Sequence, residues 1–408
     1  MEIHRTPPRY PRQGPSCLLV LAVMAALAVG VYAVTHAEQV RNAILPDPTA
    51  TPTRSPASYA ANAKLFERDG AFEEAAAAYT ASLELDPSNV NYYIPLVRLL
   101  VRTGDLDMAL QRANEAVELA RDNDKAWSIK AAAHLAKGDR LQEVGQSDAS
   151  YGEYNRAVDA ARYATELNPS NAEAYAYAAG ALISLGPEHY TEAQEAAEAA
   201  QTLDPNSPII QYYYALVLVN QGYYAAAQEQ LELSIRIHPE YVDMYITLAQ
   251  IYFFAADQRQ SAILTLQDAL DVEPNNAEVY DLLAYFYLVA GQAPEAERNA
   301  RQAVTLDPEM VRAHAHLGHA YYKGFNYPKA IEELKIAVKG YDKPTSDTAI
   351  YFAMLGLAYY FENAADCPTA IPYFNTTLTV AEPNSPAQIS AQDGLDLCRA
   401  YELSQPAP

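Results

Sequence analysis

The sequence predicts an all-α solenoid, in which pairs of antiparallel helices stack one after another. Three observations lead to this fold class. A short phrase ending in proline and a polar pair recurs, for example Leu-Asp-Pro-Ser-Asn at 85–89 and Leu-Asn-Pro-Ser-Asn at 167–171. The prolines at 169, 205, 239, 274 and 308 follow one another at steps of 36, 34, 35 and 34 residues. The 26 prolines outnumber the 16 glycines, and alanine-rich runs such as 73–78 lie between them. Helices that end at regular intervals produce this pattern, because proline stops a helix and alanine favours one.

Composition excludes several classes of protein. A chain of 408 residues is too long for one simple domain, so several domains or a repeat array are expected. The formal charge of -23 argues against nucleic acid as a partner, because phosphate contacts need a basic surface. Three cysteines are too few for a disulfide-dense scaffold, and no C-x-x-C pair suggests a zinc site.

The N-terminus predicts a membrane anchor. Residues 17–34 carry no charge, and a helix of this length spans ~27 Å, close to the thickness of the hydrocarbon core. Arg5, Arg9 and Arg12 precede it, so residues 1–16 are expected to be a basic cytoplasmic N-terminus and 17–35 a transmembrane signal-anchor helix. The alternative is a cleaved signal peptide, which would give a secreted protein. Both alternatives export the rest of the chain.

Residues 36–57 are predicted to be an extended linker. Threonine and alanine alternate there with prolines at 46, 48, 52 and 56, which cannot form a helix together.

From residue 58 to 383 each unit of about 34 residues repeats one pattern of large and small side chains. In the unit that starts at Pro56, Tyr59, Phe66 and Tyr79 stand at positions 4, 11 and 24, with small residues at positions 8 and 20 and Pro87 at 32. In the unit that starts at Ala277, Tyr280 and Tyr287 stand at positions 4 and 11, small residues at 8, 20 and 24, and Pro308 at 32. Large residues fill the space between two helices, and small ones let the backbones approach.

This pattern resembles the tetratricopeptide-repeat family. The resemblance implies a right-handed superhelix of helix-turn-helix units, each of which buries its apolar face only by stacking on its neighbours. About nine units are expected, which begin near Pro56, Val90, Asp124, Ala172, Pro208, Val242, Ala277, Val311 and Ala349. Two units depart from the pattern, because Arg121 and Asp342 stand where the proline belongs.

The third unit carries an insertion near residues 139–152. This segment (DRLQEVGQSDASYG) is polar and is expected to lengthen the helices or to form a protruding loop. Insertions on one face often carry binding specificity, although long surface insertions are also tolerated without a function.

The segment 384–408 is predicted to be a capping helix and tail. Residues 385–403 form an amphipathic pattern that would cover the last apolar face of the solenoid. Cys367 in the last unit and Cys398 in this helix fall in elements that stacking places side by side. A disulfide between them is plausible in an exported domain, and two unpaired thiols are the alternative.

No pattern of residues predicts catalysis, so the chain is not expected to be an enzyme or to hold a cofactor. There is no phosphate-binding loop, nucleophile elbow or H-E-x-x-H pair. His314, His316 and His319 are the candidate metal ligands, but His314 falls at a packing position. The other two have no carboxylate nearby in the sequence, so no metal site is expected.

The resemblance implies a protein-binding groove on the concave side, lined by positions 2, 5, 9, 12 and 13 of each first helix. Carried onto this chain, these positions give a basic end and an apolar, mostly aromatic end. The basic residues are Lys64, Arg68, Arg98, Arg102 and Lys125, with Glu67 among them. The apolar residues are Tyr212, Leu216, Phe253, Phe254, Tyr285, Leu288, Tyr322, Tyr360 and Phe361. Such rings are enriched at binding hot spots, but at helical spacing they are equally expected in a core.

The family's clamp for chaperone tails is not matched. It needs Lys and Asn at positions 5 and 9 of one unit and Asn at position 6 of the next, where this chain has Ala60, Lys64 and Pro95.

These observations predict a non-enzymatic scaffold, held in the cell membrane by a single pass, which binds a protein or peptide outside the cytoplasm. The sequence leaves open the partner and the oligomeric state. A second hypothesis is an assembly factor of a bacterial envelope or polysaccharide-export machine. An enzyme or its regulatory subunit is the hypothesis from another class.

Overall fold

The structure is a computed structural model that describes residues 17–35, 55–362 and 366–404. It divides the chain into an N-terminal segment, residues 1–55, and a helical body, residues 56–408. The predicted basic N-terminus and nearly all of the predicted linker lie outside the described residues.

The N-terminal segment contains one described helix, α1 (Cys17–Thr35). Among the described residues, no helix combines the length and the apolar character that a bilayer span requires.

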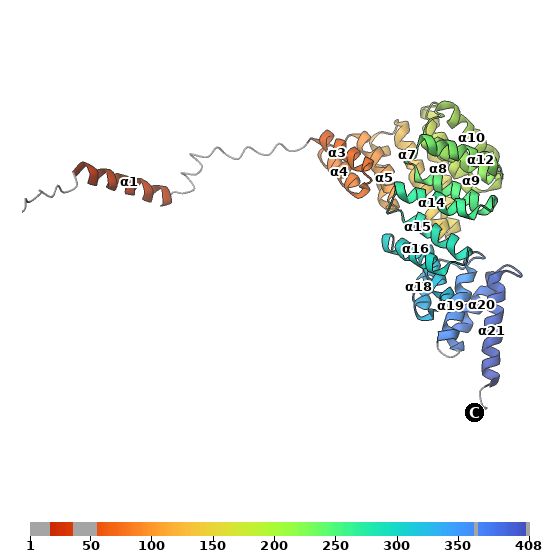
Figure 1. Cartoon of the computed structure of the whole chain (residues 1–408). Coiled ribbons are helices and arrows are strands. Elements are labelled where there is room, and N and C mark those ends of the chain that lie inside the picture. The colour runs from red at the N-terminus through yellow and green to blue at the C-terminus, as the bar shows by residue number, and fades with distance from the viewer. Residues whose placement is uncertain (1–16, 36–54, 363–365, 405–408) are drawn as a thin grey trace, which may run out of the picture. The chain divides into compact units, whose positions relative to one another are not determined.

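The helical body confirms the predicted all-α solenoid, since its described residues form helices and no strands. Helices that follow one another in sequence also lie side by side, from α3 to α21 (Figure 1). The first helices of the pairs are α3 (Pro56–Arg68), α5 (Val90–Arg102), α7 (Asp124–Glu143), α9 (Ala172–Leu185), α11 (Pro208–Asn220), α13 (Val242–Gln250), α15 (Ala277–Val289), α17 (Val311–Lys323) and α19 (Ala349–Glu362). The second helices are α4 (Phe72–Leu85), α6 (Leu106–Leu119), α8 (Ser147–Leu167), α10 (Tyr190–Leu203), α12 (Tyr224–Ile237), α14 (Arg259–Val272), α16 (Ala293–Leu306), α18 (Tyr327–Gly340) and α20 (Cys367–Val380). The last helix is α21 (Pro386–Ser404).

The recurring phrase with proline and asparagine builds the junction between consecutive pairs. Its asparagine caps the next helix: the side chain of Asn171 accepts a hydrogen bond from Ala174 N at 3.0 Å, and Asn276 does the same for Val279 at 3.0 Å. The side chain at position 4 then donates to the carbonyl of the proline that follows the preceding helix. Tyr245 Oη donates in this way to the Pro239 carbonyl at 3.0 Å. Backbone groups that helix ends leave unpaired are thus satisfied by residues of the repeat itself.

The alternation of small and large residues fixes how closely the two helices of a pair approach. A Cβ added to Gly318 on α17 would stand 2.7 Å from Leu334 Cγ on α18. One added to Gly356 on α19 would stand 2.6 Å from the Phe374 ring on α20. Leu334 and Phe374 are fully buried, so the large side chain of one helix fills the space that the glycine of the other leaves.

Two pairs contain a short irregular helix. A 3-10 turn, η1 (Pro187–His189), lies between α9 and α10, and a π-helical turn, η2 (Ile251–Ala255), follows α13. The unit that starts with α13 is 35 residues long, one more than the usual 34. The π turn η2 accommodates this extra residue, because a π turn holds one more residue than an α turn.

The polar insertion lengthens two helices. Residues 139–143 continue α7 and residues 147–152 begin α8, which makes these helices 20 and 21 residues long. The turn between them, residues 144–146, closes the longest hairpin in the described helical body.

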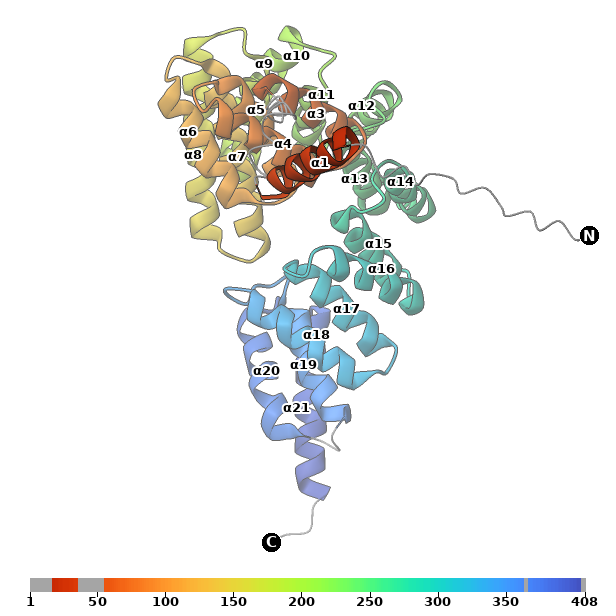
Figure 2. The ribbon, with the colours of Figure 1, turned by 90° about the vertical axis from the view of Figure 1, so that its left-hand side faces the viewer.

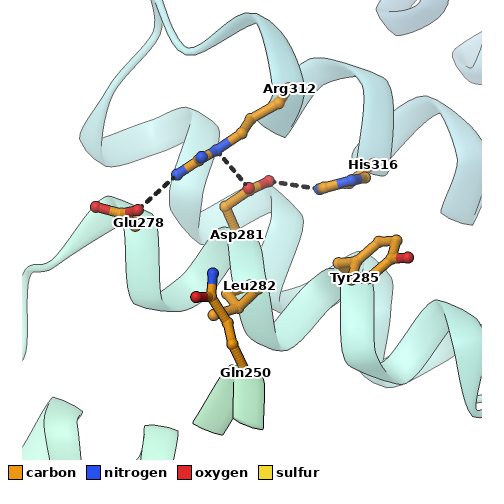
Figure 3. Close-up of a pocket in the computed structure, with 7 residues that line it drawn as sticks. All are labelled: Gln250, Glu278, Asp281, Leu282, Tyr285, Arg312 and His316. Atoms are coloured by element: carbon orange, nitrogen blue, oxygen red, sulfur yellow. Dashed lines mark hydrogen bonds and ion pairs between the residues drawn. The ribbon is translucent and has the colours of Figure 1, made fainter. Parts of the chain in front are cut away.

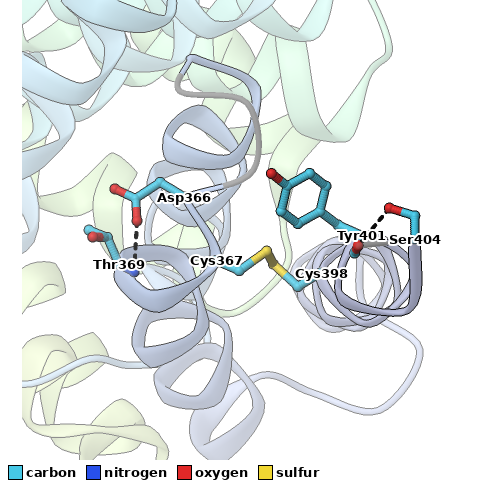
Figure 4. Close-up of a disulfide and its surroundings, with 6 residues drawn as sticks. All are labelled: Asp366, Cys367, Thr369, Cys398, Tyr401 and Ser404. Atoms are coloured by element: carbon cyan, nitrogen blue, oxygen red, sulfur yellow. Dashed lines mark hydrogen bonds between the residues drawn. A yellow bond between two sulfur atoms is a disulfide. The ribbon is translucent and has the colours of Figure 1, made fainter. Parts of the chain in front are cut away.

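A disulfide joins the last two helices. Cys367 at the start of α20 is bonded to Cys398 on α21, with Cα atoms 5.5 Å apart (Figure 4). Both cysteines are buried, in a cluster that also contains Phe374. A bridge across a loop of this size stabilises a fold by about 2–4 kcal/mol, mainly by restricting the unfolded chain.

Candidate functional site

A pocket of about 220 Å³ opens on three consecutive first helices. We call it the Arg312 pocket (Figure 3). It is lined by Gln250 at the end of α13, by Glu278, Asp281, Leu282 and Tyr285 on α15, and by Arg312 and His316 on α17. Five of the seven stand at positions 2, 5 or 9 of their units, which the family resemblance assigns to the concave side.

Asp281 is the centre of a charged network in this pocket. Its side chain is 3% exposed and forms an ion pair with Arg312 Nε at 2.9 Å. The other carboxylate oxygen lies 2.6 Å from His316 Nδ1. Arg312 also reaches Glu278 on α15 at 3.1 Å and Glu143 at the end of α7 at 2.8 Å. Three helices from two distant parts of the sequence therefore meet at one guanidinium group.

The network keeps both central groups charged. Burial would raise the pKa of Asp281, but His316 and Arg312 outweigh it, so the pKa is lowered below its usual value. Burial likewise disfavours the charged guanidinium, yet Glu278, Asp281 and Glu143 raise the pKa of Arg312. A paired, buried network of this kind holds side chains in one geometry more than it adds stability.

Tyr285 lines the pocket beside His316, and further aromatic rings lie next to it. The Tyr285 ring lies 5.3 Å from the His316 ring and 6.2 Å from Phe254. Phe254 is 62% exposed, whereas Phe253 is 7% exposed and stacks on Phe286 at 3.9 Å. Of the two neighbouring phenylalanines that the sequence analysis placed in the groove, Phe253 is therefore a core residue and Phe254 is accessible.

The other predicted apolar groove residues are spread along the helical body. Leu288 is buried, and Tyr212, Leu216, Tyr322 and Tyr360 are partly buried. Phe361 is 44% exposed and stacks on Tyr327 at 5.4 Å, away from the Arg312 pocket residues.

The predicted basic residues lie on α3, α5 and α7, and two are paired with acids from later helices. Arg98 forms an ion pair with Glu173 at 3.0 Å, and Arg102 pairs with Glu273 and lies over the Phe72 ring. Arg68 pairs with its neighbour Asp69, and Lys64 and Lys125 are exposed. Whether this cluster binds a partner stays a prediction.

Carboxylates lie close to His314 and His316, so the expectation that His316 lacks one nearby is wrong. His314 Nδ1 lies 2.6 Å from Glu333 on α18, and this hydrogen bond raises the pKa of His314. His319 makes no hydrogen bond through Nε2, and burial lowers its pKa to about 3. Within the described ranges, no group of three or more potential ligands could hold a metal ion.

Sequence reasoning identified Tyr285 but missed the charged part of the pocket. One signal was present: Asp281 is the one acid in the apolar run 279–289, at a position that faces the groove. Its partners lie on other helices, so no local pattern pointed to them.

Comparisons with known proteins identify the repeat. Models of the tetratricopeptide repeat match residues 68–133, 188–242 and 282–346. The chain is 23% identical over 280 residues to the Hsp70-Hsp90 organizing protein of Triticum aestivum; the match covers 69% of this chain and 40% of that protein. It is 27% identical to the Protein CTR9 homolog of Arabidopsis thaliana, covering 61% of this chain and 22% of the relative. The chain therefore spans less than half of each of these two relatives.

Solved structures with a similar fold include the Cut9 and Hcn1 complex of the APC/C and human IFIT1. The first has a TM-score of 0.54 at 13% identity and covers 90% of this chain and 81% of that chain. The second has a TM-score of 0.55 at 17% identity and covers 89% and 84%. At these identities the likeness shows the fold alone.

Proposed function

We propose that this tetratricopeptide-repeat protein is a non-enzymatic scaffold whose partner protein anchors in the Arg312 pocket. The observation that carries the proposal is the pocket itself. A charged network fixed by Asp281 lies beside the accessible aromatic edge of Tyr285 and Phe254. Pockets that combine aromatic walls with a few fixed polar groups are typical of binding sites.

The size and charge of the pocket define what it accepts. Its volume of about 220 Å³ is below the ~300 Å³ at which small-molecule sites usually begin, so one side chain of a partner fits better than a free ligand. The charges of Asp281 and Arg312 are already paired within the chain. We therefore expect an apolar or aromatic anchor residue, with the Gln250 amide free to hydrogen-bond the partner's backbone.

A site-specific crosslink tests this function. A photoreactive residue at position 250 of the full chain is expected to form an adduct with the partner in cells, and the same residue at Arg236 on α12 is not. When the chain also carries Tyr285→Ala, the yield of this adduct should fall about 10-fold or more, because aromatic anchors contribute ~2 kcal/mol or more to binding. The proposal fails if adducts form equally at 236 and 250, or if Tyr285→Ala leaves the adduct at 250 unchanged.

We also propose that the helical body acts outside the cytoplasm, either held by the apolar segment 17–35 or released after its cleavage. The uncharged stretch, with Arg5, Arg9 and Arg12 before it, supports this location. The bond between Cys367 and Cys398 agrees with it, because disulfides persist mainly in oxidising compartments.

Thiol trapping in intact cells tests the location. Alkylation at the moment of lysis should find Cys367 and Cys398 bonded in the full chain, and free in a variant that lacks residues 2–35. Free thiols in both forms would contradict export. The mass of the mature chain then separates an anchor from a cleaved signal.

A further inference from the structure

The tip of the α7–α8 hairpin contacts helices that lie far along the chain. The backbone N–H of Asp342, in the loop after α18, donates to the Val144 carbonyl at 3.0 Å. Arg140 Nη2 donates to the Glu309 carbonyl before α17 at 3.3 Å. Figure 2 shows the end of this hairpin beside the loop between α18 and α19. Four helix pairs, α9–α10, α11–α12, α13–α14 and α15–α16, separate the two contact regions in sequence.

The same tip supplies an acid that pairs with Arg312, a residue of the pocket. Glu143 lies 2.8 Å from Arg312, whose other carboxylate partners, Glu278 and Asp281, both come from α15. The side chains of Glu143 and Arg312 are 35% and 31% exposed, so water and a partner can reach this pair. The charged network of the pocket therefore includes a residue of the insertion.

The turn at the tip is shaped for this contact. Gly145 has φ of 80°, a left-handed conformation that other residues rarely adopt. A Cβ added to it would stand 3.3 Å from the Lys343 carbonyl. A larger residue would therefore strain the turn and push the tip away from the loop after α18.

Another ion pair between distant helix pairs and an irregular turn involve the helices between α8 and α17. Arg102 on α5 pairs with Glu273, between α14 and α15. Between these contacts, η2 interrupts the first helix of its pair, and Asp257 has φ of 50° at the following turn. π turns of this kind recur at functional sites, and this one marks the point where the stack is least regular.

We propose that the tip of the insertion, residues 140–145, is a strap that holds α7 against α17 and thereby positions Arg312 and sets the width of the binding groove. The effect of the strap on partner binding rests on the proposed function, whereas the existence of the strap is independent of that function. If the insertion only lengthened two helices, detaching its tip would alter nothing beyond residues 139–152.

Two full-length variants detach the tip by different means. The double variant Arg140→Gln and Glu143→Gln removes the ion pairs, and Gly145→Val disturbs the turn. Arg156→Gln is the matched control, because it removes an exposed ion pair with Glu153 that stays within α8. The altered side chains lie at or near the surface, and unchanged far-UV circular dichroism would show that each variant folds.

Hydrogen exchange and small-angle X-ray scattering test the strap on the isolated protein, without a partner. In both tip variants we expect the Asp342 amide to exchange ~10-fold faster, since its acceptor has left, and the radius of gyration to increase. The Asp204 amide, which donates to the Ala200 carbonyl, reports on α10 and should not change. Wild-type exchange at Asp342 and wild-type scattering in both variants would overturn the strap.

The crosslink at position 250 separates the strap from the proposed function. A strap that sets the groove changes the yield of the partner adduct in the tip variants but not in Arg156→Gln. A faster Asp342 amide with an unchanged adduct would leave a structural strap and remove its role in binding. If the wild type forms no adduct, the proposed function fails while the exchange result still decides the strap.

Discussion

Replacing Asp281 with alanine is expected to destabilise the region around α15 and α17 by about 3 kcal/mol. Removing one partner of a buried ion pair costs about 3–5 kcal/mol, because the remaining charge loses its compensation. The lower end applies here, since Arg312 keeps Glu143 and Glu278 and is 31% exposed. His316, which is nearly buried, loses its hydrogen bond at the same time.

Hydrogen exchange along α15 and α17 measures this loss better than one global unfolding curve, because stacked repeats unfold in sections. Glu278→Ala is the control: it removes a half-exposed partner of the same arginine, for which about 0–1 kcal/mol is expected. If the two variants lose equal protection, Asp281 is not the centre of the network.

The effect of Asp281 depends on pH in a defined direction. Its pKa in the folded protein lies below the usual 3.8, so the carboxylate contributes stability that is fully present above that value. The contribution is lost as the pH falls through the lower pKa of the folded protein. The difference between wild type and Asp281→Ala is therefore expected to be constant near neutral pH and to shrink below about pH 4. A difference that grows towards acid pH would mean that Asp281 is protonated in the native state.

The helices were predictable from sequence because their signals are local. Proline ends a helix, asparagine caps the next, and a small residue at position 8 faces a large one at position 24, all within one unit. The step of 35 residues between Pro239 and Pro274 also reveals one residue beyond the usual spacing. The spacing does not show which turn of the unit contains the extra residue, because several turns could hold it. The structure places it in η2.

The charged part of the candidate site could not be predicted, because its partners are distant in sequence. Glu143 and Arg312 are 169 residues apart and meet only because the stack curves back on itself. Arg98 and Arg102 looked like a free basic cluster for the same reason, since Glu173 and Glu273 stand in later helix pairs. Repeat patterns specify each unit and its neighbour, whereas contacts across several units depend on small rotations that add up along the stack.

Replacing Phe374 with alanine is the second variant with a large expected effect, about 3–5 kcal/mol, since a fully buried phenylalanine leaves a cavity that its surroundings fill only partly. The ring lies between two glycines: a Cβ on Gly356 would stand 2.6 Å from it and one on Gly394 2.3 Å. It therefore joins α19, α20 and α21 at the end of the solenoid. The disulfide between Cys367 and Cys398 keeps α20 and α21 connected but does not fill the cavity.

The glycines make this prediction selective. On its own, Gly394→Ala is expected to destabilise the last helices, because its methyl group would clash with the Phe374 ring. Combined with Phe374→Ala, the same methyl group points into the cavity and should recover part of the loss, so the two changes are not additive. Phe254→Ala, at a ring that is 62% exposed, controls for the loss of a phenylalanine as such and should leave the exchange of α20 and α21 unchanged. Additive losses from Phe374→Ala and Gly394→Ala would show that the ring does not pack against Gly394, and the cap would then be held mainly by its disulfide.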